Sequence, residues 1–324
     1  MTDSLTAPPP RPHRNRGLTH QGLLYGSGQE FLDTTVPFCL EGLEQRDAVL
    51  AVTGAANAAL LRQALGKASG QVEFVDADEW YRTPGRTLGA YYRYVDQRTR
   101  EGRHQRVRVI GEPVWHGRDA LETAEWARYE AALNVAFAHC PAWVICPYDT
   151  RVLPESIVAG ALRTHPHLAV PASSRPSDRY EDPAAGDGWH RPLVPVAGEG
   201  ERTVMRFGAD LSAVRSTVAQ AAAGMGLSAD GTQRLVFVVN EVATNAVQHG
   251  GGEGHIAVRR AGRRIVCDVT STGPNKTDWY LGYLPPDPQQ RHGHGMWVVR
   301  QLCDLLEVHT DQDSTTVRLH VSLG

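Results

Sequence analysis

A carboxylate and an amide lie at helical spacing in the second half of the sequence. Glu241 and Asn245 are four residues apart, so on a helix both side chains project from one face. A carboxylate can accept a proton from a nucleophile, and an amide oxygen suits Mg²⁺, a hard cation that prefers oxygen ligands. The pair therefore indicates proton transfer beside a metal ion, although a solvated helix face would show the same spacing.

A glycine-containing turn follows about 50 residues later and enters a predicted helix. Arg291, Gly293 and Gly295 belong to this turn. Such a turn lets backbone N–H groups approach a phosphate at the positive end of the helix. Two glycines before a helix are commonly only a turn. The order of the two motifs, with a strand and a Gly-Pro turn between them, is more specific than either motif alone.

Together these motifs resemble the ATPase domains of the gyrase, histidine kinase and MutL superfamily, and in particular bacterial anti-sigma-factor serine kinases of the stress response. The resemblance covers residues 207–324. It implies a Bergerat-type ATPase fold, an α+β domain with helices on one face of a mixed, mostly antiparallel sheet. It also implies that Glu241 is the general base, that Asn245 holds the Mg²⁺ bound with ATP, and that the turn at residues 291–295 cradles the phosphates.

The motif that reads adenine departs from the family pattern. In the family it is D-x-G, whose Asp accepts a hydrogen bond from the adenine amino group, whereas here Ser271 precedes Gly273. Asp268 lies three residues before Ser271 on a predicted strand and so points to the opposite face. A serine hydroxyl lacks the charge that roughly doubles the strength of such a bond. We expect His249, Ser271 and Gly273 to contact nucleotide, with affinity for ATP and Mg²⁺ weakened or abolished.

The first half alternates short apolar runs with longer amphipathic stretches, which is typical of an α/β domain with a largely parallel sheet. The expected strands are 48–52, 72–75, 107–110 and 143–146, and the expected helices are 30–44, 54–65, 121–138 and 154–163. The second half predicts strands at 203–207, 255–259, 265–270, 306–310 and 315–321, and helices at 211–224, 231–249 and 295–306.

Four pieces of the first half, at residues 20–25, 111–115, 126–137 and 146–149, resemble the MEDS sensory domain. This domain is named after methanogen and methylotroph regulators and is thought to bind small molecules. The resemblance implies a fold of the RecA/KaiC type. The whole chain then resembles actinobacterial two-domain regulators, in which this sensor precedes an anti-sigma kinase-like domain.

Several polar and aromatic side chains of the first half lie close to the expected carboxyl ends of strands, where open α/β sheets bind ligands. A zinc site from His139, Cys140 and Cys146 matches no structural zinc spacing. Simpler interpretations make Cys146 a buried small hydrophobe, His20 a loop or capping residue and Trp115 an anchor at the core edge. The sensor-pocket candidates are His20, Tyr25, Glu112, Trp115, Cys146, Tyr148 and Asp149.

Composition excludes several classes of protein. The chain has 324 residues, 41% of them hydrophobic and 21% charged, with a formal net charge of -3, which argues against disorder and against a strongly basic nucleic-acid binder. Neither Lys67 nor Lys276, the only lysines, follows a G-x-x-x-x-G pattern, so a P-loop ATPase is excluded. In the first half the stretch 54–59 replaces any phosphate loop, and we expect no nucleotide there.

Length predicts two domains. We place a disordered tail at 1–17, the MEDS-like sensor at 18–168, a Pro-rich linker at 169–201 and the ATPase-like domain at 202–324. Five cysteines without a C-x-x-C pair indicate reduced thiols and a cytoplasmic protein, and no apolar run is long enough for a membrane span.

Two functions stay open. The first is a serine/threonine protein kinase and anti-sigma factor that sequesters a sigma factor and phosphorylates an antagonist protein, in signal transduction to transcription. The second is a pseudo-kinase, a binding module that docks the sigma factor or the antagonist without phosphotransfer. In both, the N-terminal domain binds an unknown small molecule, and the formation of a homodimer stays open, although relatives of the C-terminal domain commonly pair. A nucleic-acid-binding regulator rests only on the basic tail.

Overall fold

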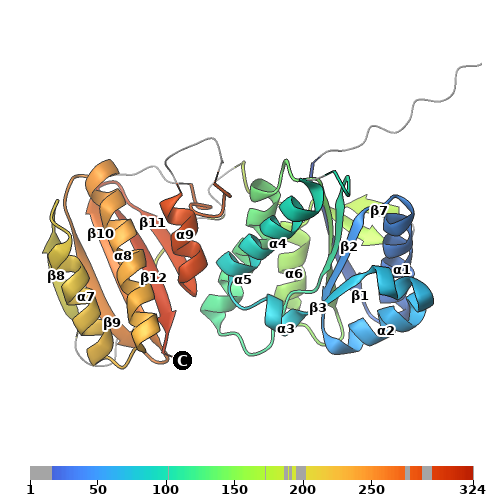
Figure 1. The fold of residues 1–324 in the computed structure, drawn as a ribbon, viewed down its shortest axis with the longest axis horizontal. Helices are drawn as coiled ribbons and strands as arrows, with labels where there is room; N and C mark the ends of the chain where they lie inside the picture. Colours follow the sequence, from blue (N-terminus) through green and yellow to red (C-terminus); the bar gives the residue numbers. More distant parts are fainter. Residues whose placement is uncertain are drawn as a thin grey trace, which may run out of the picture.

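The computed structural model describes residues 17–100, 102–171, 173–185, 189, 192–194, 202–273, 278–286 and 294–323. The expected N-terminal tail up to residue 16, much of the linker, and Arg291 and Gly293 of the phosphate turn lie outside these residues. The described chain folds around two separate sheets, one in each half (Figure 1).

A seven-stranded sheet with the order β3-β2-β4-β5-β1-β6-β7 organises the N-terminal domain. Its strands pair in parallel, apart from the antiparallel pair β6 and β7 at the edge. The elements are β1 (Thr19–Tyr25), α1 (Gly28–Glu44), β2 (Ala48–Thr53), α2 (Ala55–Leu65), a 3-10 turn (Gly66–Gln71), β3 (Glu73–Asp76), α3 (Ala77–Trp80), α4 (Pro84–Thr99), β4 (Val107–Gly111), α5 (Ala120–Ala136), β5 (Ala142–Asp149), α6 (Glu155–Thr164), β6 (His167–Val170) and β7 (Ser173–Pro176).

Both faces of this sheet are covered, so its central strands are apolar along their whole length. In β2, Leu50 and Val52 pack toward α4, α5 and α6, whereas Val49 and Ala51 pack toward α1 and α2. This alternation makes a three-layer α/β domain, as the sequence predicts.

A five-stranded antiparallel sheet with the order β11-β12-β10-β9-β8 organises the C-terminal domain. Its elements are β8 (Thr203–Phe207), α7 (Ser212–Gly224), α8 (Ala229–His249), β9 (Gly254–Ala261), β10 (Arg264–Thr272), α9 (Gly295–Leu302), β11 (Leu305–Thr310) and β12 (Ser314–Ser322). The helices lie on one face of the sheet (Figure 1), which confirms the expected α+β class.

Two faces of β10 carry different chemistry. Ile265, Cys267 and Val269 face the helices and the core, whereas Asp268 faces the other way and is held by two arginines. Ser271 continues the odd-numbered row and so lies on the helix side.

The structure adds elements that we did not expect. The helix α4 and the first strand β1 were not among the expected elements, and β6 and β7 add two strands to the sheet. Residues 169–170 and 173–176, which we expected to lie in the linker, therefore belong to the N-terminal sheet. The helix expected at 295–306 ends at Leu302, because β11 begins at Leu305.

The two domains share a buried contact between α4 and α9 (Figure 1). Gly85 and Gly89 lie one helical turn apart on α4, and a Cβ at either position would overlap Arg300 or Gln301 of α9. The Gln301 amide donates to the Gly85 carbonyl at 2.6 Å. The two glycines therefore let α9 lie close against the N-terminal domain.

A buried carboxylate reinforces this contact. Glu125 of α5 accepts hydrogen bonds from Arg300 at 3.2 Å and from Tyr283 at 3.0 Å, and Arg128 pairs with it from one turn further along α5. Arg300 also donates to the Leu281 carbonyl at 2.6 Å. The interface is therefore specified by charge as well as by packing.

Membrane-spanning character is absent from the described helices, none of which combines the necessary length with the necessary apolar surface.

Candidate functional site

A cavity of about 810 Å³ lies between α8, β10, the loop 278–286 and the start of α9. This volume is within the range of pockets that hold small ligands. Its lining includes Glu241, Asn245 and His249 of α8, Ser271 of β10, Gly295, Met296 and Trp297 of α9, and Thr315 of β12. The cavity therefore brings together five of the C-terminal residues singled out from the sequence: Glu241, Asn245, His249, Ser271 and Gly295.

Glu241 and Asn245 share one face of α8, and that face looks at the start of α9. A Cβ at Gly295 would lie 3.1 Å from Oε2 of Glu241 and 3.8 Å from Nδ2 of Asn245. Local sequence explains the register: Ser228 caps α8 by accepting a hydrogen bond from the Gly231 N–H at 3.1 Å. The Glu241 carboxylate and the Asn245 amide therefore lie close to the positive end of a second helix, α9.

The other end of the cavity has no carboxylate where the family pattern would place one. Ser271 is buried, and its hydroxyl lies 3.4 Å from the Thr315 carbonyl, at the long limit of a hydrogen bond. Gly273 adopts a φ of 90° and lies at the end of β10. His249 is exposed at the last turn of α8 and lines the cavity rim.

Asp268 does not substitute for the missing carboxylate. It accepts hydrogen bonds from Arg318 at 2.7 Å and from Arg259 at 2.9 Å on the face of the sheet away from the cavity. Burial raises the pKa of Asp268, but the two guanidinium groups outweigh burial and lower it. Its charge is therefore already neutralised far from the cavity.

In the N-terminal sheet β2 and β4 are neighbours, and the chain leaves β2 toward β3 and leaves β4 toward β5, in opposite directions. Open α/β sheets bind ligands at the carboxyl ends of two such strands. Glu112 fills this point. Its carboxylate accepts hydrogen bonds from the Gly54 N–H at 2.9 Å, from Asn57 at 2.8 Å, and from the Thr53 hydroxyl. Tyr25 joins the group through Asn57 at 2.9 Å.

This arrangement places an internal anion at the amino end of α2. A nucleotide-binding domain of this architecture would hold a phosphate at the same kind of position. Desolvation is the main cause that raises the pKa of Tyr25 to about 12, so the phenol stays neutral beside Glu112. The carboxylate and its partners thus occupy the position that a ligand anion would need.

The remaining sensor-pocket candidates divide into two places. Asp149 lies at the surface, where Arg151 holds it through a bidentate pair and lowers its pKa. Trp115 is partly buried, with its ring 6.3 Å from that of Tyr148. His20, Cys146 and Tyr148 are instead buried in the middle of the domain.

Two residues that sequence reasoning missed join this buried group, Glu130 of α5 and His165 just after α6. Glu130 lies one residue from Tyr129 on the core side of α5, which is an unusual position for a carboxylate. Burial raises the pKa of Glu130, but the imidazoles of His165 and His20 have the larger, opposite effect. The net result is a pKa of about 2. His165 follows the expected helix 154–163 and precedes a proline, a position that marks a helix end and gives no sign of a ligand.

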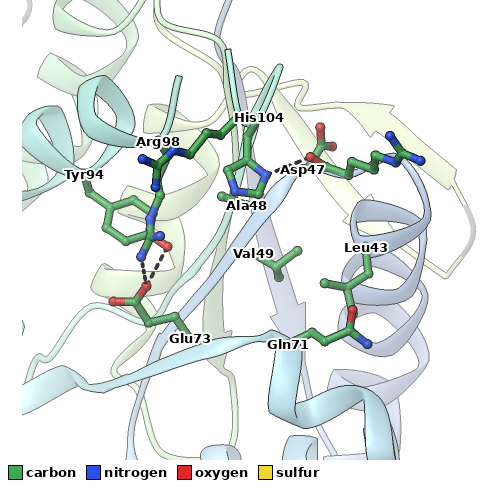
Figure 2. Close-up of a pocket in the computed structure, with 11 residues that line it drawn as sticks. Leu43, Asp47, Ala48, Val49, Gln71, Glu73, Tyr94, Arg98 and His104 are labelled. Carbon is green, nitrogen blue, oxygen red and sulfur yellow. Dashed lines mark hydrogen bonds and ion pairs between the residues drawn. The ribbon is translucent and has the colours of Figure 1, made fainter. Parts of the chain in front are cut away.

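A second cavity, of about 410 Å³, lies at the amino ends of β2 and β3 in the N-terminal sheet (Figure 2). Figure 2 shows Glu73 accepting hydrogen bonds from Tyr94 and Arg98 on its wall. These charges are paired with each other at the protein surface. The cavity does not include any residue expected from the sequence to bind a ligand.

Comparisons with known proteins match the two halves separately. Residues 19–166 match the model of the methanogen/methylotroph and DcmR sensory domain, MEDS, and residues 208–321 match that of the histidine kinase-like ATPase domain. A crystal structure of the RsbU and RsbW domains of a Mycobacterium tuberculosis protein is similar at 18% identity and a TM-score of 0.28. The match covers 38% of this chain and 32% of that chain.

No curated protein matches this chain. The family matches confirm the two domain types expected from the sequence and their order along the chain. The chain carries a MEDS domain followed by a histidine kinase-like ATPase domain.

Proposed function

We propose that this protein is a signalling regulator in which the MEDS domain controls an anti-sigma, kinase-like ATPase domain. The observation that carries the proposal is the cavity in which Glu241 and Asn245 face the start of α9. Histidine kinase-like ATPase domains bind ATP with Mg²⁺ in general. We therefore infer ATP with Mg²⁺ as the ligand of this cavity.

The residues present fit the phosphate end of such a ligand. Asn245 offers an amide oxygen for Mg²⁺, and the first turn of α9 offers backbone N–H groups and a positive helix end. A bound Mg²⁺ would neutralise charge on the phosphates during transfer. Arg291 and Gly293 remain proposed contributors to the same phosphate turn.

Glu241 is the proposed general base. Its carboxylate lies beside the proposed phosphate position and could accept the proton of a serine hydroxyl on a partner protein. The base and the metal ligand come from one rigid helix, which is held by buried Leu235, Val239 and Val242. Because both residues belong to one packed helix, the Glu241 carboxylate and the Asn245 amide keep a constant separation.

The adenine end fits less well, and this supports an alternative. Ser271 offers a neutral hydroxyl, and His249 and Gly273 add no carboxylate. A pseudo-kinase that docks a sigma factor or an antagonist protein needs the fold but not tight nucleotide binding. The alternative stays open because it depends on the affinity that Ser271 allows.

Control by the sensor would act through α9. The start of this helix lines the cavity, and its end, at Arg300 and Gln301, lies against α4 and α5 of the MEDS domain. A small shift of α4 would move one end of a rigid helix whose other end borders the proposed nucleotide. A small-molecule ligand of the MEDS domain could therefore change nucleotide or partner binding.

Location and partners are further parts of the proposal. All five cysteines are free thiols in the structure, which supports a reducing, cytoplasmic environment. The proposed partners are a sigma factor and an antagonist protein, with a homodimer as the expected assembly and no direct contact with nucleic acid or membrane. Stress response and transcription regulation would follow from the sigma-factor partner.

Calorimetric titration of ATP with Mg²⁺ tests the nucleotide proposal. We expect binding to the native chain, loss of most of it in Asn245→Ala, and retention in Asn240→Ala. The matched control lies on the same helix but bonds to Arg215. Absence of binding to the native chain, together with a gain in Ser271→Asp, would contradict the kinase proposal and favour the pseudo-kinase.

The control by the sensor has a separate test. Gln301→Ala removes an amide that bonds to α4 without touching the cavity, so we expect a severalfold change in nucleotide affinity. Gln233→Ala, an exposed position on α8, is the control. Equal affinity in Gln301→Ala and in the native chain would contradict coupling through α9.

A further inference from the structure

Four side chains that the proposed function does not use meet in the core of the MEDS domain. They are His20 of β1, Glu130 of α5, Cys146 of β5 and His165 after α6, and each is at least 98% buried. One potential ligand atom from each lies within 4.8 Å of all the others. A histidine pair, a thiol and a carboxylate are typical ligands of transition metals.

Hydrogen bonds determine the tautomer of His20. Its Nδ1 lies 3.1 Å from Oδ1 of Asn134, and the Nδ2 of the same amide donates to the Thr164 carbonyl at 2.8 Å. Because the second bond identifies the donor end of Asn134, Oδ1 must accept from Nδ1 of His20. In the neutral imidazole, which is the form that binds a metal, the lone pair of His20 is therefore on Nε2, which faces the centre of the cluster.

The same reasoning applies to His165. Its Nδ1 lies 2.8 Å from the Ala161 carbonyl, which can only accept a hydrogen bond, so Nδ1 carries the proton. Nε2 is left with its lone pair and points at Glu130. Metal-binding histidines are oriented in this way, with one nitrogen donating to an oxygen and the other directed at the ion.

Three separations between the ligand atoms fit a tetrahedral site. Nε2 of each histidine lies 3.5 Å from Oε2 of Glu130, and Sγ of Cys146 lies 3.4 Å from Nε2 of His20. An ion about 2.0–2.3 Å from four such ligands needs neighbouring ligand atoms roughly 3.3–3.8 Å apart. Three of the six separations therefore have the spacing that zinc requires, and the other three are within 4.8 Å.

Some buried polar atoms of the cluster also have no hydrogen-bond partner among the described residues. Both carboxylate oxygens of Glu130 and Nε2 of His165 are buried, and neither residue finds a hydrogen bond for these atoms within the described part of the chain. A buried carboxylate left in this state is costly. A divalent cation would satisfy these atoms together, and with a Cys146 thiolate and a Glu130 carboxylate the site would be neutral overall.

We propose that His20, Glu130, Cys146 and His165 bind one zinc-class transition-metal ion in the MEDS domain. Binding removes one proton, from the Cys146 thiol, and involves no redox change. The ion would join β1, β5, α5 and the end of α6, so it would tie the middle of the sheet to two of its covering helices. The proposed nucleotide cavity shares no residue with this site.

Metal analysis of the full chain tests the proposal directly. The protein is expressed without a histidine tag, stripped with a chelator and titrated with Zn²⁺ and then Co²⁺. We expect one tightly held ion per chain, and for Co²⁺ an intense thiolate charge-transfer absorption with the d–d bands of a tetrahedral site. Folded native protein that binds no stoichiometric ion, or binds Co²⁺ without the thiolate absorption, would overturn the proposal.

Matched variants locate the ion. Cys146→Ser should lose the thiolate absorption and bind the metal at least tenfold more weakly, because one ligand in four is removed. Cys39→Ser, which changes another buried cysteine of the same domain, should retain both. Unchanged absorption in Cys146→Ser would overturn the assignment. If Cys146→Ser does not fold, the Co²⁺ spectrum of the native chain alone decides.

Discussion

Each domain has a helix that begins beside a candidate site, α2 in the MEDS domain and α9 in the C-terminal domain. The surroundings of the two helix starts differ. At α2, the Glu112 carboxylate already accepts from the Gly54 N–H, from Asn57 and from Thr53. At α9, the start of the helix borders a cavity of about 810 Å³, and the Glu241 carboxylate lies beside it, 3.1 Å from where a Cβ of Gly295 would be. A helix start thus indicates an anion site where open space adjoins it, and not where hydrogen bonds already hold a carboxylate of the protein in place.

The contrast supports the proposal that nucleotide binds to the C-terminal domain and not to the MEDS domain. Loss of a phosphate loop in the MEDS domain is accompanied by an internal carboxylate in its place. The C-terminal domain instead has a cavity beside the start of α9, and Ser271 stands where the family pattern places an Asp.

The largest effect is expected where the two domains meet. Glu125→Ala removes the carboxylate that pairs with Arg128, Arg300 and the Tyr283 hydroxyl, and leaves two buried guanidinium groups without it. We expect a loss of about 3–5 kcal/mol in the free energy of unfolding. Chemical denaturation followed by tryptophan fluorescence measures it.

Glu125→Gln is the control, since the amide still accepts from Tyr283 and should lose less. If Glu125→Ala lost less than about 1 kcal/mol, which is the contribution of an exposed ion pair, the domains would not depend on this contact.

Removing the internal anion is expected to have the next largest effect. Glu112→Ala leaves the Gly54 N–H and Asn57 without their acceptor and should destabilise the MEDS domain by about 2 kcal/mol. Urea denaturation measures the loss, with Glu112→Gln as a matched variant. Because the domain has no phosphate loop, ATP should not stabilise it in Glu112→Ala, and stabilisation by ATP there would break the contrast.

A smaller effect concerns the carboxylate on the outer face of β10. The pKa of Asp268 is lowered in the folded protein, so its contribution is fully present above its unfolded pKa of about 3.9 and is lost as pH falls through the folded pKa. Asp268→Asn should cost about 1.5 kcal/mol at neutral pH. The difference from the native chain should vanish in acid.

Denaturation at a series of pH values measures this difference. A constant difference between Asp268→Asn and the native chain down to the acid end would show that the charge of Asp268 does not contribute to stability.

The smallest effect, and the most specific, is expected at the adenine end. Ser271→Asp adds a carboxylate for the adenine amino group, so ATP should bind about tenfold more tightly, which is about 1.4 kcal/mol. GTP carries a carbonyl at the corresponding ring position and should gain nothing. Calorimetry with both nucleotides measures the change, and an equal gain for GTP would place the base elsewhere.

Sequence patterns predicted the elements with clear periodicity. The shared face of Glu241 and Asn245 on α8, and the opposite faces of Asp268 and Ser271, followed from helix and strand periods alone. The helix α4 was missed because Pro84, Gly85 and Gly89 look like breakers. Proline is tolerated in the first turn, and the glycines serve the approach of α9, which local sequence does not reveal.

The buried cluster shows the same limit. His20 and Cys146 were singled out, whereas Glu130 and His165 were not, because the four residues lie far apart in the sequence and meet only through the strand order. A signal was present for Glu130, a carboxylate on the core side of a helix between Trp126 and Leu133. His165 gave none, since a histidine before proline equally indicates a helix end.

Hydrogen–deuterium exchange of the intact protein with and without ATP and Mg²⁺ tests the central contrast most directly. The account predicts slower exchange in α8 around residues 241–249 and in α9 at 294–302, a weaker response in α4 across the shared contact, and none around residues 53–57. Protection around 53–57, or the absence of protection from both α8 and α9, would contradict it.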